Sequence, residues 1–141
     1  PEIYTLSLHD ALPISFEDEF FDAVGISFGF RNLTFENPDA LLHISEVFRV
    51  LKPGGRFVVL ETSQPNNRLI RAGYHFYQKY ITAPIGGLLS GNRPAYDYLA
   101  HSAINYYSIP EISEVLLEAG FSKVSGQPYL LGATAIVTAI K

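Results

Sequence analysis

Two polar residues stand side by side directly after an apolar run, Arg31 and Asn32. The arginine guanidinium is permanently charged, so it can stabilise a phenolate oxygen or orient a water molecule that removes a proton. The asparagine amide can orient an oxygen on the ring that carries the phenolate. Taken alone, the pair is more typical of a structural ion pair followed by a turn cap.

Further candidates follow the next apolar run. Residues 61–64, Glu-Thr-Ser-Gln, are polar, and we select Gln64 as the one that lines a substrate pocket. The alternative is that these residues only face solvent.

Tyrosines gather in residues 66–107, which hold seven of the nine in the chain. Tyr74 and Tyr77 are the best candidates for contact with a flat aromatic molecule, because a phenol ring offers a stacking face and a hydroxyl group. The alternative is that tyrosines at helical spacing belong to the core. His75 or His101 could accept a proton, and the sequence selects neither.

The elements that position Arg31 and Gln64 form a strand–helix–strand unit. Phe20–Phe30 is typical of a strand buried on both faces. Residues 37–51 carry a broad apolar helical stripe from Leu41 to Leu51, and Pro53-Gly54-Gly55 is expected to end that helix. A buried strand follows at 56–62, so a parallel pair with a helical crossover is expected.

The rest of the chain divides into a cap and a closing unit. Residues 66–107 are predicted to form a helical cap or insertion, with one helix to about Thr82, a loop, and a second helix from about Ala95. Ser108 and Glu111 have the spacing of a capping box at the start of a further helix, and Gly120 fits its C-terminal end. The last residues, 122–141, are predicted to form an antiparallel hairpin.

Composition narrows the classes of function. The chain has 141 residues, a net charge of −4 and no basic stripe, which argues against nucleic acid as a partner. Cysteine is absent and the four histidines are widely spaced, so we expect no disulfide and no metal site. No apolar run reaches the roughly 20 residues of a membrane span. A cytoplasmic protein is expected.

The first fifteen residues are interpreted separately. Tyr4 to Ile14, YTLSLHDALPI, equals the translation of a common sequencing adapter in one reading frame. We therefore predict that residues 1–15 are not native and that Phe16 is the first native residue. The lack of Met at position 1 is a further hint of a cut chain.

Three motifs resemble the quinone-biosynthesis C-methyltransferases, which use S-adenosylmethionine. They are FDAVGISFGFRNL at 21–33, RVLKPGGRFVVLETSQP at 49–65, and LLEAGFSKV at 116–124 followed by GATAIVTAIK. The resemblance covers Phe16 to Lys141. It implies an α/β fold, the C-terminal strands four to seven of a Rossmann-like class I methyltransferase sheet, with the N-terminal half missing.

The resemblance also implies roles for single residues. Ser27 matches a serine that contacts S-adenosylmethionine, and Arg31 and Asn32 match the catalytic corner that faces the methyl acceptor. The implied acceptor is a polyprenyl quinol, demethylmenaquinol in preference to the ubiquinone precursor, and Tyr74, Tyr77 and Gln64 are the expected substrate contacts. The glycine-rich loop and the acidic residue that holds the ribose are not matched, which puts cofactor binding in doubt.

Several alternatives stay open. The isolated chain could be inactive, a partial domain whose unpaired sheet edge recruits another strand. It could instead act on another small molecule as a different class I methyltransferase. Arg68, Arg71 and Lys79 could contact a membrane surface where a lipophilic substrate resides, and association with a second copy of the chain is also left open.

Overall fold

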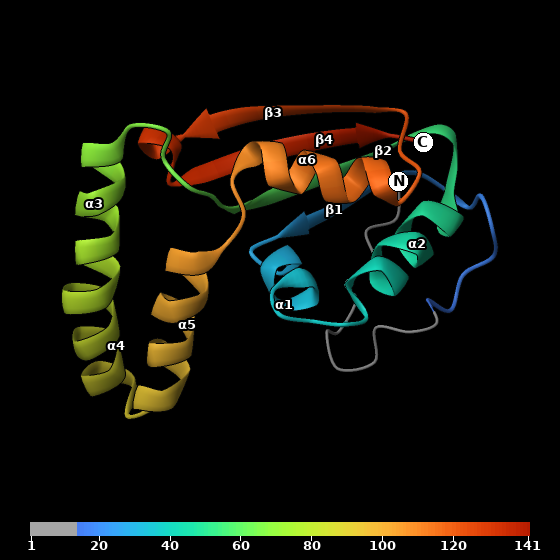
Figure 1. The fold of residues 1–141 in the computed structure, drawn as a ribbon. Coiled ribbons are helices and arrows are strands. Elements are labelled where there is room, and N and C mark those ends of the chain that lie inside the picture. Colours follow the sequence, from blue (N-terminus) through green and yellow to red (C-terminus); the bar gives the residue numbers. More distant parts are fainter. Residues whose placement is uncertain (1–13) are drawn as a thin grey trace.

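The computed structural model describes residues 14–141, shown in Figure 1. Of the segment predicted to be non-native, only Ile14 and Ser15 fall within the described residues. The Ile14 side chain is buried, and its backbone amide donates to Oε2 of Glu46 over 3.0 Å. The elements in chain order are β1 Phe21–Ser27, α1 Phe30–Thr34, α2 Ala40–Val50, β2 Leu51–Thr62, α3 Arg68–Tyr77, the π-helical segment η2 Gln78–Thr82, α4 Ala83–Ser90, α5 Arg93–Asn105, α6 Ile109–Glu118, β3 Lys123–Tyr129, the short 3₁₀ turn η3 Leu130–Gly132 and β4 Thr134–Ile140.

The four strands form one sheet in the order β1-β2-β4-β3. β1 and β2 run parallel, and α2 makes the crossover between them, which confirms the predicted strand–helix–strand unit. β4 pairs antiparallel with both β2 and β3, so the predicted closing hairpin is also confirmed. The result is an α/β sheet with a parallel half and an antiparallel half.

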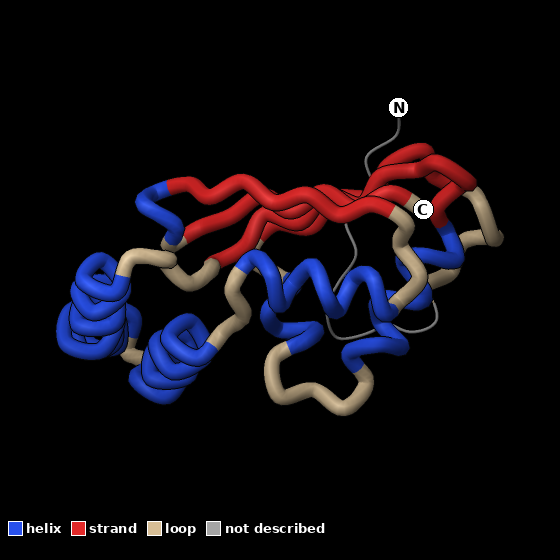
Figure 2. Tube along the Cα trace, turned by 45° about the horizontal axis from the view of Figure 1, so that its top comes forward, coloured by secondary structure: helices blue, strands red, loops and turns tan. Residues whose placement is uncertain are grey.

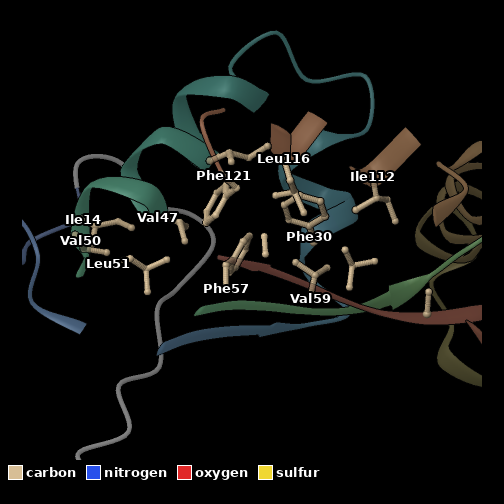
Figure 3. Packing of buried hydrophobic residues seen from close by; sticks show 14 of the residues in the cluster. Ile14, Phe30, Val47, Val50, Leu51, Phe57, Val59, Ile112, Leu116 and Phe121 are labelled. Carbon is tan, nitrogen blue, oxygen red and sulfur yellow. The ribbon is translucent and has the colours of Figure 1, made fainter. Parts of the chain in front are cut away.

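The helices α1, α2 and α6 lie against one face of the sheet, as Figure 2 shows. Every second residue of β2 points to that face, and Phe57 and Val59 are fully buried there. The rings of Phe30 and Phe57 meet edge to face at 5.8 Å, and Phe121 stacks on Phe57 at 5.9 Å. This aromatic cluster, closed by Leu116, is the centre of the core (Figure 3).

The turn after α2 differs from the prediction. α2 ends at Val50, and Leu51 already pairs with Phe21, so Pro53-Gly54-Gly55 does not end the helix. Instead the register shifts, and these residues bulge from β2 before pairing resumes at Arg56. Gly54 has a φ of 76°, a conformation that favours glycine, and its amide donates to the carbonyl of Lys141.

The apolar stripe of α2 is narrower than predicted. Ile44, Val47 and Val50 are buried, whereas Leu41 and Leu42 are 52% and 53% exposed. The helix therefore packs on the core through its last two turns only. Its first turn projects beyond the part of the core that the described residues form.

The middle of the cap was predicted to be a loop, and this was wrong. Residues 83–90 form α4, which continues from α3 through η2, and the connection to α5 is limited to residues 91–92. The glycines that suggested a loop are packing residues. A Cβ on Gly86 would lie 2.1 Å from the Tyr96 ring, so glycine there allows α4 and α5 to approach closely.

The start and end of α6 match their sequence signals. The Ser108 amide donates to Glu111 Oε2 over 2.7 Å, and both halves of the capping box are present. Gly120 follows the helix with a φ of 103°. These contacts fix the direction in which α6 crosses the sheet. No helix in the part of the chain that the structure describes is long and apolar enough to cross a membrane.

Candidate active site

The site lies beyond the carboxyl ends of β1 and β2, where the helical cap (residues 66–107) faces the sheet (Figure 1). Open α/β sheets bind ligands at this edge. A cavity of about 400 Å³ opens there between α1, the end of β2, η2 and α5. Its lining residues are Phe28, Arg31, Asn32, Thr62, Gln78, Ala95, Tyr98, Leu99 and Ala103.

Arg31 is the charged group of this cavity. It is only 7% exposed and lies in the first turn of α1, because β1 ends at Ser27 and not at Phe30 as predicted. Its Nη1 donates to Thr62 Oγ1 over 3.2 Å. Among the described residues no acceptor reaches its buried Nε. An unpaired donor on a buried cation is costly, so this N–H is available to an oxygen that enters the cavity.

Glu61 holds Arg31 in position, a role that the sequence did not reveal. The side chain is 1% exposed, and its Oε2 accepts from the backbone amide of Arg31 over 3.0 Å. Its Oε1 accepts from the amide and the hydroxyl of Thr62. The Thr62 hydroxyl thus bridges the guanidinium and the carboxylate. The buried positive and negative charges compensate each other without direct contact of the two side chains.

Two aromatic residues line the same cavity and were also missed. Phe28 has a φ of 50°, which is unusual for a residue with a bulky side chain and costs roughly 1–2 kcal/mol. Its amide donates to the carbonyl of Leu60, which holds the strained turn in place. Tyr98 contributes from α5 on the cap side. The cavity therefore combines aromatic surface with one buried cation.

The inner face of the cap brings further polar groups toward the sheet. Tyr74 Oη, Gln78 Oε1 and Thr82 Oγ1 are buried, and among residues 14–141 none of them makes a well-formed hydrogen bond, although the Gln78 side chain lies near the Tyr74 hydroxyl. Burial raises the pKa of the Tyr74 phenol, so this group stays neutral at ordinary pH. Gln78 begins the π-helical segment, and such segments often occur at functional sites.

The other predicted site residues are dispersed. Asn32 lines the cavity beside Arg31, and Ser27 is exposed at the end of β1 outside the lining. Tyr77 is 53% exposed on the outward face of α3 and does not reach the cavity. The tyrosine that lines the cavity is Tyr98, on α5.

Gln64 lies in a second cavity of about 400 Å³ on the other side of the α3–α5 contact. Its Oε1 is 2.8 Å from His75 Nε2, and its amide nitrogen donates to the Ala103 carbonyl. Burial, and to a lesser degree the nearby Arg71 guanidinium, lower the pKa of His75. Gln64 therefore links the strand end to both cap helices and does not line the Arg31 cavity.

Comparison with solved structures defines the fold as that of class I methyltransferases. An S-adenosylmethionine-dependent methyltransferase from Thermotoga maritima superposes with a TM-score of 0.58 and 17% identity, over 93% of this chain and 61% of that one. One from Aquifex aeolicus gives 0.55 and 18%, over 99% and 54%.

The chain belongs to the ubiE/COQ5 methyltransferase family, whose model matches residues 4–141. Demethylmenaquinone methyltransferases from Oceanobacillus iheyensis and Bacillus pumilus are 38% and 40% identical to it. The two matches cover 90% and 89% of this chain, and 52% of each relative. The chain thus spans about half the length of the curated relatives that it matches.

Proposed function

We propose that the protein methylates a ring carbon of a polyprenyl quinol, with demethylmenaquinol as the preferred acceptor and S-adenosylmethionine as the methyl donor. The names of the relatives support the reaction and the acceptor. The observation that carries the proposal is the nearly buried Arg31 side chain in the lining of the aromatic cavity beyond the strand ends.

Arg31 would act on the acceptor oxygen. A quinol is a weak carbon nucleophile until its hydroxyl group loses a proton, because the phenolate pushes electron density onto the ring carbon. A buried cation with a free N–H favours the phenolate by charge and by hydrogen bonding. The backbone and hydroxyl contacts of Glu61 and Thr62 keep the guanidinium in one orientation.

The remaining lining residues would orient the ring. Phe28 and Tyr98 offer aromatic faces from opposite sides of the cavity entrance, one from the sheet and one from the cap. Asn32 and Gln78 carry amides that can hold the second ring oxygen. Tyr74 stands next to this region with its hydroxyl unpaired within the described chain, and we retain it as a substrate contact.

Only part of a cofactor site is recognisable in these residues. When bound, S-adenosylmethionine supplies an electrophilic methyl group on its sulfonium. The Ser27 hydroxyl is exposed at the carboxyl end of β1, which is an edge strand of the described sheet, so it can hydrogen-bond to a ligand there. This chain's own contribution is therefore one contact to the donor and most of the acceptor cavity. We propose a cytoplasmic protein that meets its lipophilic acceptor at the membrane.

The test compares the 141-residue chain with the whole protein encoded at the same locus. Each is incubated with labelled S-adenosylmethionine and demethylmenaquinol, the ubiquinone precursor or an unrelated phenol. We expect methylation of demethylmenaquinol by the whole protein. Transfer to the unrelated phenol alone would overturn the proposed acceptor. Saturable micromolar cofactor binding by the isolated chain would overturn the alternative that the chain is inactive by itself.

Arg31→Gln in the whole protein separates charge from structure. We expect a roughly 10²–10³-fold lower rate at pH 7, with partial recovery as the pH approaches the pKa of the free quinol, because hydroxide then replaces the lost stabilisation of the phenolate. Arg56→Gln, on the exposed side of β2, is the matched control. If the rate of Arg31→Gln changes with pH in the same way as the rate of the unmodified protein, with no recovery at high pH, the proposed role of Arg31 is contradicted.

A further inference from the structure

The outward face of the cap is apolar, although it is exposed. Leu69 and Leu88 are each 82% exposed, and between them exposed apolar side chains follow from Phe76 to Ile85 at intervals of one, three or four residues along the end of α3, η2 and the start of α4. The extra residue in the π turn keeps them in one line as the helix continues. We call this line the outer stripe, and its members are Leu69, Phe76, Tyr77, Tyr80, Ile81, Ile85 and Leu88.

The inward face of the same helix is polar. Tyr74, Gln78 and Thr82 point their polar atoms toward the sheet and α5, and Arg71 donates from Nε to the Pro65 carbonyl over 2.7 Å. A helix on the surface of a water-soluble protein normally has the opposite arrangement, with its apolar side buried. The polar and apolar sides of the cap helix are therefore exchanged relative to an ordinary surface helix, which indicates that the outer stripe contacts something other than water.

The position of the helix supports this interpretation. In Figures 1 and 2, α3 and α4 form the outermost rod of the molecule, and α5 lies on their inner side. No described residue packs over Leu69 or Leu88. The stripe is therefore a projecting edge, which can reach a flat surface without obstruction from the body of the protein.

Charge distinguishes the cap from the rest of the chain. Residues 66–107 hold four of the ten lysines and arginines but one of the fourteen acidic residues, so the cap carries +3 and the remainder −7. Arg68 and Lys79 are exposed on the same helix as the stripe, and Arg93 lies at the start of α5. An apolar stripe flanked by cations is the pattern of helices that lie on anionic lipid surfaces.

We propose that the outer stripe docks on the surface of a bilayer that contains anionic lipid, with α3–η2–α4 lying in the plane of the interface. Cations near an anionic leaflet contribute roughly 1 kcal/mol each, and the leucine and aromatic side chains enter the headgroup boundary. The cavity opens between η2 and α5, on the inner side of the docked helix. The proposal deepens the proposed function, because a polyprenyl acceptor would reach that cavity from the same bilayer.

Sedimentation with vesicles tests the docking without any cofactor or acceptor, so its outcome does not depend on the methyl transfer. The whole protein and the 141-residue chain are mixed with vesicles of phosphatidylcholine alone or with 30% phosphatidylglycerol. We expect binding to the anionic vesicles and at least about tenfold weaker binding of Leu69→Ser/Leu88→Ser. Arg68→Glu/Lys79→Glu should lose the preference for anionic lipid.

The matched controls are Leu130→Ser/Leu131→Ser, two leucines that are each 77% exposed on η3, and Lys123→Glu on β3. Both should bind vesicles like the unmodified protein. Equal loss of binding in the controls, or no binding to either vesicle, would overturn the proposal. So would a dimer in light scattering that Leu69→Ser/Leu88→Ser converts to a monomer, because the stripe would then be a contact between copies.

Discussion

The sheet with its packed helices and the helical cap follow opposite rules of burial. In the sheet region the apolar side chains Phe30, Phe57 and Phe121 are inside, and among the described residues the only buried charged ones are Arg31 and Glu61, at the site. In the cap the inner side carries polar atoms without partners among the described residues, and the outer side carries leucines and aromatics. Burial of apolar surface therefore stabilises the sheet region more than the cap.

The difference is also one of charge and contact. The cap carries an excess of cations, and thirteen of the fourteen acidic residues lie elsewhere. The cap is joined to the sheet region by the Gln64 side chain, bonded to both His75 and Ala103, and by the buried Tyr106 hydroxyl, 2.8 Å from Thr34 Oγ1. A region with a small apolar core and unpaired polar groups is expected to open at lower free energy than the sheet.

The largest effect should come from the centre of the sheet region. Phe57→Ala removes a ring that is 1% exposed and packs on Phe30 and Phe121, so it should lower the free energy of unfolding by about 3–5 kcal/mol. Leu88→Ala, in the cap, should change it by about 0.5 kcal/mol or less. Urea denaturation measures both. Similar losses for the two variants would remove the distinction between the regions.

A medium effect should come from two glycines of the cap. Gly86→Ala forces a Cβ to within 2.1 Å of the Tyr96 ring and should destabilise the α4–α5 contact by about 1–3 kcal/mol. Gly73→Ala, on α3, meets nothing within 4 Å and should stabilise the helix by about 0.5–1 kcal/mol. Thermal unfolding followed by circular dichroism gives both signs. Equal changes would mean that α4 and α5 are not closely packed.

What the sequence predicted well was short-range. The capping box at Ser108, the left-handed Gly120 and the closing hairpin each depend on residues close together in the sequence, and all are present, whereas β1, predicted to be buried on both faces, has no buried residue. The parallel pairing of β1 and β2 followed from two apolar runs joined by a helix. Neighbouring residues alone determine these features, so a single sequence is enough to predict them.

What the sequence could not predict depends on contacts between distant segments. From the sequence, Gly86 is typical of a loop, and only its close contact with Tyr96 shows that it is a packing residue. Tyr77 is a reasonable site candidate from the sequence, and only the folded structure shows that it lies on the exposed face of α3. Glu61 joins the site because α1 brings the Arg31 amide to the end of β2, and Tyr98 joins it because the cap folds over the strand ends. Arg31 and Asn32 were selected through the family motif, and the structure places both in the lining of one cavity.

The smallest effect concerns the junction between the two regions, where Ser108 begins α6 after the cap. Hydrogen bonds from the Ser108 hydroxyl and amide lower the pKa of Glu111 below its ordinary value of 4.5. Because the folded pKa is lower than the unfolded one, the stabilisation is complete above about pH 4.5 and is lost as the pH falls through the lowered folded value.

Glu111→Gln should therefore cost at most about 1 kcal/mol at pH 7, since glutamine can still accept from the cap, and it should flatten the decline in stability below pH 5. Glu114→Gln, on the exposed side of the same helix, is the control and should keep that decline. Urea denaturation between pH 3 and 7 measures both. If Glu111→Gln retains the full slope, the capping box does not contribute to the acid sensitivity of the junction.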